Sequence, residues 1–289
     1  MKKYIFISFL LLACEQPHQS ITELYSLPKK LKEVSGIAYT SQDQSIWTIE
    51  DSGNASAIYK IDATGKKTKT VTITDVQNLD WEDITMDKNG DVYIGDFGNN
   101  DNERQDLSIY KVAINDLDNE NVTTAYKISF SYPEQKQFPP SKKELWYDVE
   151  GFFEMNNNFY LFTKNRSKGF DGTTLIYKIP NQAGSHKAIF LDSFKTCDTY
   201  KSCAITSAVL SPDQSKVVLL THDKIILFEN FKGDDFLSGT QTTLELNHFS
   251  QKEAATFIDN DSMLLADEKN GSDGGKVYKT SISQLKTKT

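Results

Sequence analysis

Acidic residues recur along this 289-residue sequence at the start of short β-rich runs. A glutamate opens the run in four places, and a hydroxyl pair does so in a fifth: Glu33, Glu82, Glu150, Thr206–Ser207 and Glu253. A second polar residue follows each of these positions by 14 to 18 residues, in the order Asp51, Asp96, Lys164, His222 and Asp267. If the chain folds so that equivalent positions meet, these side chains form two rings around one opening.

Carboxylates that face one another in a narrow opening repel, so either some bind protons with a raised pKa or a cation neutralises them. Hard cations suit such oxygen ligands, because Ca²⁺ takes about six to eight of them and Mg²⁺ takes an octahedron. We expect a Ca²⁺ site, with Mg²⁺ as the alternative, among Glu33, Glu82, Asp96, Glu150, Glu253 and Asp267. The other reading is structural: the glutamates accept hydrogen bonds from backbone N–H groups and organise the start of each run.

The same residues include the candidates for acid–base catalysis, although the sequence leaves open whether the protein is an enzyme. A metal-dependent hydrolase would use Glu82, Asp96 or His222 as its general base. The structural reading of a lone histidine stays beside the catalytic one. The sequence contains no Gly-x-Ser-x-Gly motif, no phosphate-binding loop and no zinc spacing of cysteine and histidine.

One segment between two of these acids, residues 95–104, is dense in aspartate, asparagine and glycine. Such a loop is able to wrap Ca²⁺, but its spacing is not that of an EF-hand. The alternative is a network of hydrogen bonds from side chains to backbone groups. Arg104, at the end of the segment, would pair with nearby carboxylates or meet an anionic ligand.

The elements that must position these residues repeat five times. An aromatic residue flanked by β-formers marks each copy, at Tyr59, Tyr110, Tyr177, Phe228 and Tyr278. The steps are 51, 67, 51 and 50 residues, and the long step contains an insertion at about 120–145. The first four copies each contain four β-rich runs separated by turn residues, and the fifth contains three. Four antiparallel strands in about 50 residues are the signature of a propeller blade.

The fold class is therefore all-β, a β-propeller in one domain at residues 21–289. We expect five blades, with six as the alternative if the insertion forms strands of its own. The fifth copy lacks a fourth strand, so Ile21–Tyr25 is expected to pair with it and close the ring, leaving no long open edge. Helix is expected to be almost absent, because no long apolar period of 3.6 residues appears in this domain.

The N-terminus has the pattern of an export signal. Met1–Lys3 is cationic, and the apolar run to Leu12 is shorter than the roughly 20 residues that span a bilayer. Residues 11–14 look like the lipobox of bacterial lipoproteins. We therefore expect a signal peptide at 1–13, acylation of Cys14 with fatty acids such as palmitate, and a tether at 14–20 that binds the membrane. The alternative is an ordinary secretory signal with a chance cysteine.

Charge and cysteine content bound the partners. The formal net charge of −8 disfavours contact with phosphate backbones, so we expect no nucleic-acid partner. In an oxidising compartment, Cys197 and Cys203 are expected to form a small disulfide ring, with a metal or redox pair as the alternative. We expect a monomer that recognises a small-molecule or protein ligand.

The repeated units also carry a family resemblance. The segments 35–38, 80–84, 149–151, 253–257 and 266–268 resemble the SdiA-regulated type of bacterial β-propeller lipoprotein, over nearly the whole mature chain. This resemblance implies a propeller with bound calcium and no settled activity. A more distant similarity, through Glu150–Gly151 and the channel acids, is to the senescence-marker and gluconolactonase propellers. Those use a channel metal to hydrolyse lactones, but their Asn and Asp metal ligands find no match here.

Together these features predict a membrane-anchored, calcium-binding recognition module of the bacterial cell envelope. The outer membrane is favoured over the inner, with the domain facing the periplasm or the cell surface. The alternative function is a metal-dependent hydrolase, of the lactonase or phosphoesterase kind, with its site at the mouth of the propeller channel.

Overall fold

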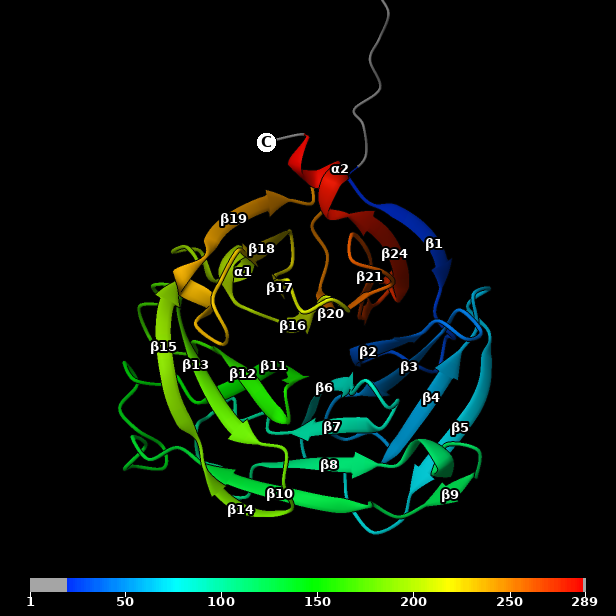
Figure 1. Ribbon diagram of the computed structural model, residues 1–289, viewed down its shortest axis with the longest axis horizontal. Coiled ribbons are helices and arrows are strands. Elements are labelled where there is room, and N and C mark those ends of the chain that lie inside the picture. Colours follow the sequence, from blue (N-terminus) through cyan, green and yellow to red (C-terminus); the bar gives the residue numbers. More distant parts are fainter. Residues whose placement is uncertain (1–19, 288–289) are drawn as a thin grey trace, which may run out of the picture.

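The computed structural model describes residues 20–287, and its sheets form five blades around a central axis (Figure 1). Each blade is a four-stranded antiparallel sheet whose first strand lies nearest the axis. The predicted all-β propeller and its five blades are confirmed.

The strand bounds follow the predicted units closely. The innermost strands are β2 (Val34–Thr40), β6 (Trp81–Met86), β11 (Asp148–Met155), β16 (Ser207–Leu210) and β20 (Lys252–Phe257). The second strands are β3 (Ser45–Glu50), β7 (Val92–Asp96), β12 (Asn158–Lys164), β17 (Lys216–Leu220) and β21 (Ser262–Asp267). The third strands, which carry the aromatic repeat, are β4 (Ala57–Ile61), β8 (Ser108–Val112), β13 (Thr173–Pro180), β18 (Lys224–Glu229) and β24 (Lys276–Ser281). The outer strands are β5 (Lys67–Ile73), β10 (Tyr126–Ser131), β15 (Ile189–Lys195), β19 (Thr240–Glu245) and β1 (Thr22–Ser26).

The hydrophobic core lies between neighbouring blades. One cluster joins the first two blades and includes Trp47 and Ile49 from one with Trp81, Ile94 and Tyr110 from the other. Four further clusters bridge the remaining neighbours in the same way. Because each sheet buries both faces against its neighbours, the alternating apolar pattern of the strands fixes which side chains face the core.

The ring closes through strand β1. It pairs antiparallel with β24 of the last blade, with Thr22 opposite Lys279, as the sequence predicts. The insertion makes no sixth blade: its short strand β9 (Asn121–Val122) adds in parallel to the outer edge of the first blade. Strand β14 (Gly184–Lys187) extends the second blade similarly.

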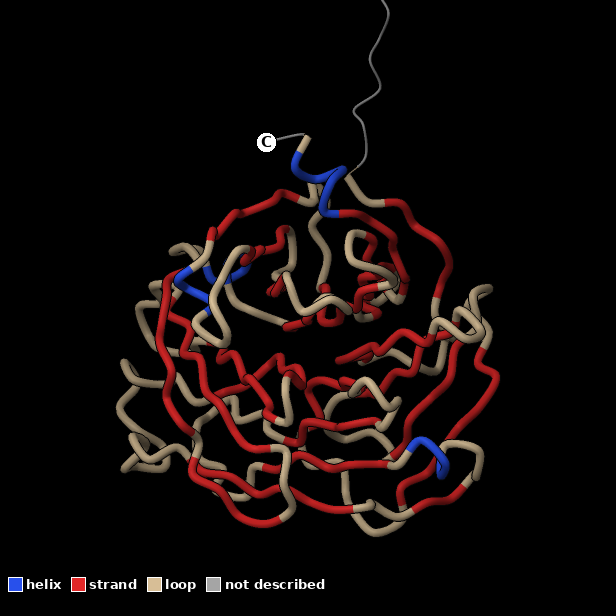
Figure 2. The backbone as a smooth tube through the Cα atoms, viewed as in Figure 1, coloured by secondary structure: helices blue, strands red, loops and turns tan. Residues whose placement is uncertain are grey.

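Helix is scarce among residues 20–287 (Figure 2). The segments are α1 (Tyr200–Cys203), α2 (Ile282–Lys286), η1 (Ile114–Asp116) and η2 (Phe236–Ser238). A disulfide between Cys197 and Cys203 encloses α1, which confirms the predicted pairing. A two-residue hairpin, β22 (Lys269–Asn270) with β23 (Asp273–Gly274), follows β21.

The predicted signal peptide at 1–13 and the lipidation site Cys14 lie outside the described residues, as does all of the tether except Ser20. Within residues 20–287, no helix is both long and apolar enough to cross a membrane.

A β-bulge recurs near the start of the innermost strand in four blades, and it is the local feature that builds the site. The register with the second strand shifts around Ser35, Glu82, Glu150 and Glu253. In the fourth blade β16 pairs with β17 without a shift. A bulge leaves one residue unpaired and changes the direction of its side chain. In three blades the bulged residue is the glutamate that opens the strand.

Candidate functional site at an acidic channel mouth

The bulged residues meet at one mouth of the channel, around a cavity of about 230 Å³. Its lining side chains are mostly charged or polar: Ser35, Asp51, Glu82, Asn100, Glu150, Lys164, Arg166, Thr206, Gln251, Glu253 and Glu268. The structure thus brings together three of the four glutamates singled out in the sequence.

Glu33 does not line this cavity. It lies two residues before the bulge, is exposed, and accepts a hydrogen bond from Asn54 Nδ2 at 2.7 Å. The residue at the bulge of the first blade is Ser35. A signal for this existed in the spacing, because Glu33 precedes Asp51 by 18 residues whereas the other intervals are 14 or 15.

The second predicted ring divides between the two faces of the sheets. Asp51 and Lys164 line the cavity, but Asp96 and Asp267 do not. Asp267 pairs with the residue before a bulge, and its neighbour Glu268 faces the cavity instead. Because successive strand residues point to opposite faces, a shift of one residue exchanges a channel position for an interblade position.

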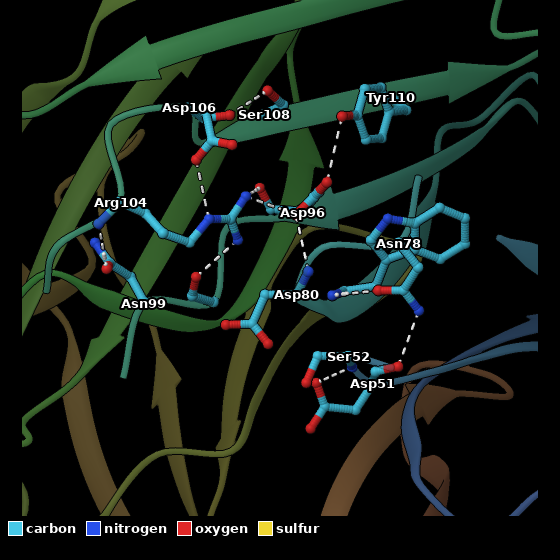
Figure 3. A network of polar contacts seen from close by, with 12 residues as sticks. Asp51, Ser52, Asn78, Asp80, Asp96, Asn99, Arg104, Asp106, Ser108 and Tyr110 are labelled. Atoms are coloured by element: carbon cyan, nitrogen blue, oxygen red, sulfur yellow. Dashed lines mark hydrogen bonds and ion pairs between the residues drawn. The ribbon is translucent and has the colours of Figure 1, made fainter. Parts of the chain in front are cut away.

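Asp96 and Asp267 instead hold neighbouring strands in place. The Asp96 carboxylate accepts hydrogen bonds from Arg104 at 2.8 Å and from the Tyr110 hydroxyl at 3.2 Å (Figure 3). Asp267 accepts from the backbone N–H of Lys276 and from the Tyr278 hydroxyl, each at 2.8 Å. Each therefore fastens the aromatic-repeat strand of its own blade.

The oxygen-rich loop at 95–104 forms a hydrogen-bond network. Arg104 pairs with Asp96 and Asp106, and its guanidinium also donates to the Gly98 carbonyl at 2.8 Å. Asn99 Oδ1 accepts from the Arg104 backbone N–H at 2.9 Å. The network reading of this loop is the one that the structure supports.

One part of the acidic cluster is neutralised by basic residues of the third blade. Arg166 donates to Asp148 Oδ2 and to Glu150 Oε1, and Lys164 lies 3.0 Å from Glu150 Oε2. The other Asp148 oxygen accepts from the Asn99 backbone N–H at 2.6 Å. All four oxygens of this pair are therefore engaged by donors from the chain itself.

The other part of the cluster has no such partner. Carboxylate oxygens of Asp51, Asp80 and Glu82 lie within 4.8 Å of one another, and no ion pair among residues 20–287 involves these side chains. Glu82 is only 7% exposed, and no described donor makes a hydrogen bond to its carboxylate. A buried carboxylate without a donor is costly, so this triad requires protons or a cation.

The electrostatics of the triad reflect this arrangement. Burial first, and the Asp51 and Asp148 carboxylates next, raise the pKa of Asp80 to about 7. Burial and the neighbouring Glu150 and Asp51 raise the pKa of Glu82 well above its usual range. The triad therefore holds protons near neutral pH unless a cation replaces them.

The backbone opposite the triad leaves room for these carboxylates. A Cβ at Gly98 would lie 2.2 Å from Glu82 Oε1 and 2.5 Å from Asp80 Oδ2, so any larger residue here would have to displace these carboxylates. Three converging carboxylates, one of them orphaned and buried, are the donor set of a hard divalent cation. These residues therefore fit a divalent cation, which is the kind of ligand expected. They are not the set of six side chains that the sequence suggested.

Several residues of this site were not singled out in the sequence for these roles. Asp148 and Arg166 are recognised only once the strands are paired. Glu268 lies one position after the predicted Asp267. Burial, followed by the Glu253 and Asp51 carboxylates, raises the pKa of Glu268 to about 8. Asp80 belonged to the segment 80–84, noted for its family resemblance, but nothing in the sequence distinguished it from Asp83.

His222 borders the site without lining the cavity. Its Nε2 lies 3.2 Å from Glu253 Oε1, and its ring contacts Phe249 edge-on. The histidine thus engages one of the bulge glutamates from the loop that follows β17.

A larger cavity of about 690 Å³ lies at the other ends of the innermost strands. Its walls include Ile37, Ile84, Phe153 and Phe257 beside amide and hydroxyl side chains. Two carboxylate groups among residues 20–287 could hold a metal, Asp51–Asp80–Glu82 and Glu82–Asp148–Glu150, and neither belongs to this cavity.

Comparison with known proteins identifies the fold class and no more. No family model matches the chain, and no curated protein is detectably similar in sequence. Among solved structures, the PQQ-bound form of an aldose sugar dehydrogenase from Streptomyces coelicolor is similar over 90% of this chain and 97% of that chain, with a TM-score of 0.52 and 11% identity. A structure from a nidogen/laminin complex is similar over 86% and 84%, with a TM-score of 0.48 and 13% identity. The likeness to the sugar dehydrogenase, at 11% identity, shows the propeller fold alone.

Proposed function

We propose that this β-propeller binds one divalent cation at its acidic mouth, Ca²⁺ in first place and Mg²⁺ as the alternative. Asp51, Asp80 and Glu82 would hold it. The observation that carries this proposal is Glu82, a buried carboxylate that faces two others and has no hydrogen-bond donor among residues 20–287. A cation at this point would supply the missing positive charge.

This ligand set differs from the six residues expected from sequence. Glu150 uses both carboxylate oxygens for Lys164 and Arg166, and Glu253 pairs with His222. Asp96 and Asp267 bind Tyr hydroxyls away from the cavity. Since Ca²⁺ takes about six to eight oxygens, three protein side chains leave several positions for water or a ligand on the cavity side.

The wider role that we propose is that of a recognition module held at a membrane of the bacterial cell envelope. The signal-like residues 1–13 and the lipobox before Cys14 support anchoring by lipid. The resemblance to SdiA-regulated-type lipoproteins supports the same assignment, with the outer membrane favoured. A cation with open positions at a channel mouth would then serve to bind a ligand in front of the membrane.

A second candidate function is metal-dependent hydrolysis, and the open cavity beside the triad favours it. Of the three candidate bases, Asp96 is held by Arg104 and Tyr110, and Glu82 would be a cation ligand. His222 is left, engaged with Glu253 at the edge of the cavity. Turnover of a lactone or phosphoester that requires the cation and is lost in His222→Gln would establish this function over simple recognition.

The proposed cation site predicts a pH-dependent stabilisation. Asp80 has a folded-state pKa of about 7, above its ordinary value, so its contribution to stability is present at low pH and is lost as the pH rises towards 7 and beyond. A cation restores that stability only where it no longer competes with protons. Calcium should therefore raise the thermal unfolding midpoint little at pH 5 and by several degrees at pH 8.

Differential scanning fluorimetry of chelator-treated protein, with and without millimolar CaCl₂, measures this effect. Repeating the series with MgCl₂ orders the two cations. Equal midpoint shifts at both pH values, or no shift at either, would contradict a site in which Asp80 and Glu82 exchange protons for a cation.

A further inference from the structure

We propose that the ligand of this mouth is a neutral polyhydroxylated molecule, that is, a carbohydrate bound through adjacent hydroxyl groups. This inference rests on the proposed cation site and adds the chemical class of ligand. It comes from three features of the cavity: its net charge, the donors and acceptors left free on its walls, and the apolar side chains at its rim.

The charge of the cavity disfavours an anionic ligand. Five carboxylates line it, against the two cations Lys164 and Arg166. With all five carboxylates ionised, one divalent cation leaves this lining with a net charge of −1. A carboxylate or phosphate would therefore enter against repulsion in a partly buried site.

The basic residues are also committed to the protein itself. The guanidinium of Arg166 donates to Asp148, Glu150 and the Tyr200 hydroxyl, so each of its three nitrogens already has a partner. Lys164 is buried against Glu150. The paired fork that recognises an anion is therefore not available at this mouth.

The remaining contacts require a ligand group that both donates a hydrogen bond and offers an oxygen lone pair. An ionised wall carboxylate such as Glu253 is an acceptor and never a donor, and its Oε1 is already paired with His222, whereas the open positions of a hard cation require oxygen lone pairs. A hydroxyl supplies both, because it donates its hydrogen to a carboxylate and offers its oxygen to the cation. An ammonium group lacks the lone pair, and a carboxylate lacks the hydrogen.

The rim carries exposed apolar side chains on three different interblade loops. Leu79, Tyr200 and Phe249 are 43%, 38% and 57% exposed. Leu79 precedes Asp80 of the triad, and the Tyr200 hydroxyl lies 2.6 Å from the cavity residue Arg166. The Phe249 ring packs against His222. Apolar faces around a polar cavity suit the C–H faces of a sugar ring, since rings such as Tyr and Phe add contact energy beyond hydrogen bonds.

The size of the cavity sets how much of such a ligand enters. Its volume of about 230 Å³ is below the range of roughly 300–1,000 Å³ that holds drug-sized molecules. One sugar ring therefore occupies the cavity, and any further residues of a glycan lie across the rim.

A glycan array probed with the purified protein tests this inference, in CaCl₂ and again in EDTA. We expect binding to neutral glycans that requires calcium, and no preference for glycans bearing sialic or uronic acids. Phe249→Ala should weaken binding by about threefold to tenfold while the calcium affinity stays unchanged. Phe190→Ala, which truncates an aromatic residue exposed on outer strand β15, is the matched control and should bind as the parent does.

The outcomes separate the two proposals. If calorimetric titration shows no calcium binding, the proposed function fails and the carbohydrate inference falls with it. If calcium binds but neutral glycans do not, the ligand class alone is wrong. Calcium-independent binding of tetramethylammonium, used as a probe of a purely acidic pocket, would also overturn the carbohydrate assignment.

Discussion

Replacing Glu82 with glutamine is expected to reduce calcium affinity on the order of 100-fold or more, because affinity in such sites follows the number of charged ligands. The same substitution should leave the calcium-free protein as stable as the parent or more so. Glutamine keeps the shape of the side chain and cannot ionise, so it avoids the buried charge that Glu150 and Asp51 would repel. Isothermal titration with CaCl₂ and thermal unfolding of the calcium-free protein measure the two effects.

Two further variants make this result interpretable. Glu154→Gln changes a glutamate of another innermost strand, β11, that lines the opposite cavity, and it should bind calcium as the parent does. Gly98→Ala keeps all three carboxylates but places a methyl group against Glu82 and Asp80, so it should weaken calcium binding by crowding alone. A Glu82→Gln protein that binds calcium normally would exclude Glu82 as a ligand.

Replacing Arg166 with methionine is expected to destabilise the protein by about 3–5 kcal/mol, the usual cost of removing one partner of a buried ion pair. Arg166 is the only side chain that pairs with both Asp148 and Glu150 among residues 20–287. Both carboxylates are buried, so the variant leaves them facing each other with only Lys164 beside Glu150. Urea denaturation at pH 7 gives the free energy of unfolding.

The control for this variant is Lys195→Met. Lys195 pairs with Asp171 on the surface, where both side chains are well exposed. Exposed pairs contribute about 1 kcal/mol or less, so this substitution should change the free energy of unfolding very little. An Arg166→Met protein as stable as the Lys195→Met protein would show that the two buried carboxylates are balanced by something other than Arg166.

The propeller could be predicted from sequence because its signals are local and repeated. An aromatic residue between β-formers marks each third strand, and successive copies follow one another at similar intervals. Closure of the ring by β1 could be predicted by counting strands, since the last unit lacked one strand and the first segment had no partner. Both signals depend on burial between blades, which requires every copy to keep the same alternation.

The site could be predicted only in part, because β-bulges decide which residues face the channel. A bulge inserts one residue and exchanges faces from that point on, and the only trace of its position in the sequence is an irregular spacing such as the 18 residues from Glu33 to Asp51. Glu82 was found correctly as a residue of the opening. Glu33 was chosen where Ser35 stands, and Asp267 was chosen where Glu268 faces the cavity.

The balance of charge within the acidic cluster could not be predicted from the sequence either. Arg166 lies 16 residues after Glu150 in the chain and is brought to it by the pairing of β11 with β12. This pairing neutralises one acidic group and leaves the other, so the expected cation ligands shift towards the first two blades. Only the strand pairing shows which carboxylates are paired with a basic side chain of the protein and which carboxylates still need a positive charge.

Crystals of the mature domain grown with CaCl₂ offer the most direct measurement, through the anomalous scattering of the bound ion. We predict one strong peak at about 2.3–2.6 Å from oxygens of Asp51, Asp80 and Glu82. A channel mouth without a peak in saturating calcium would contradict the account. So would an ion held by Glu150 and Glu253 after displacement of Lys164 and Arg166.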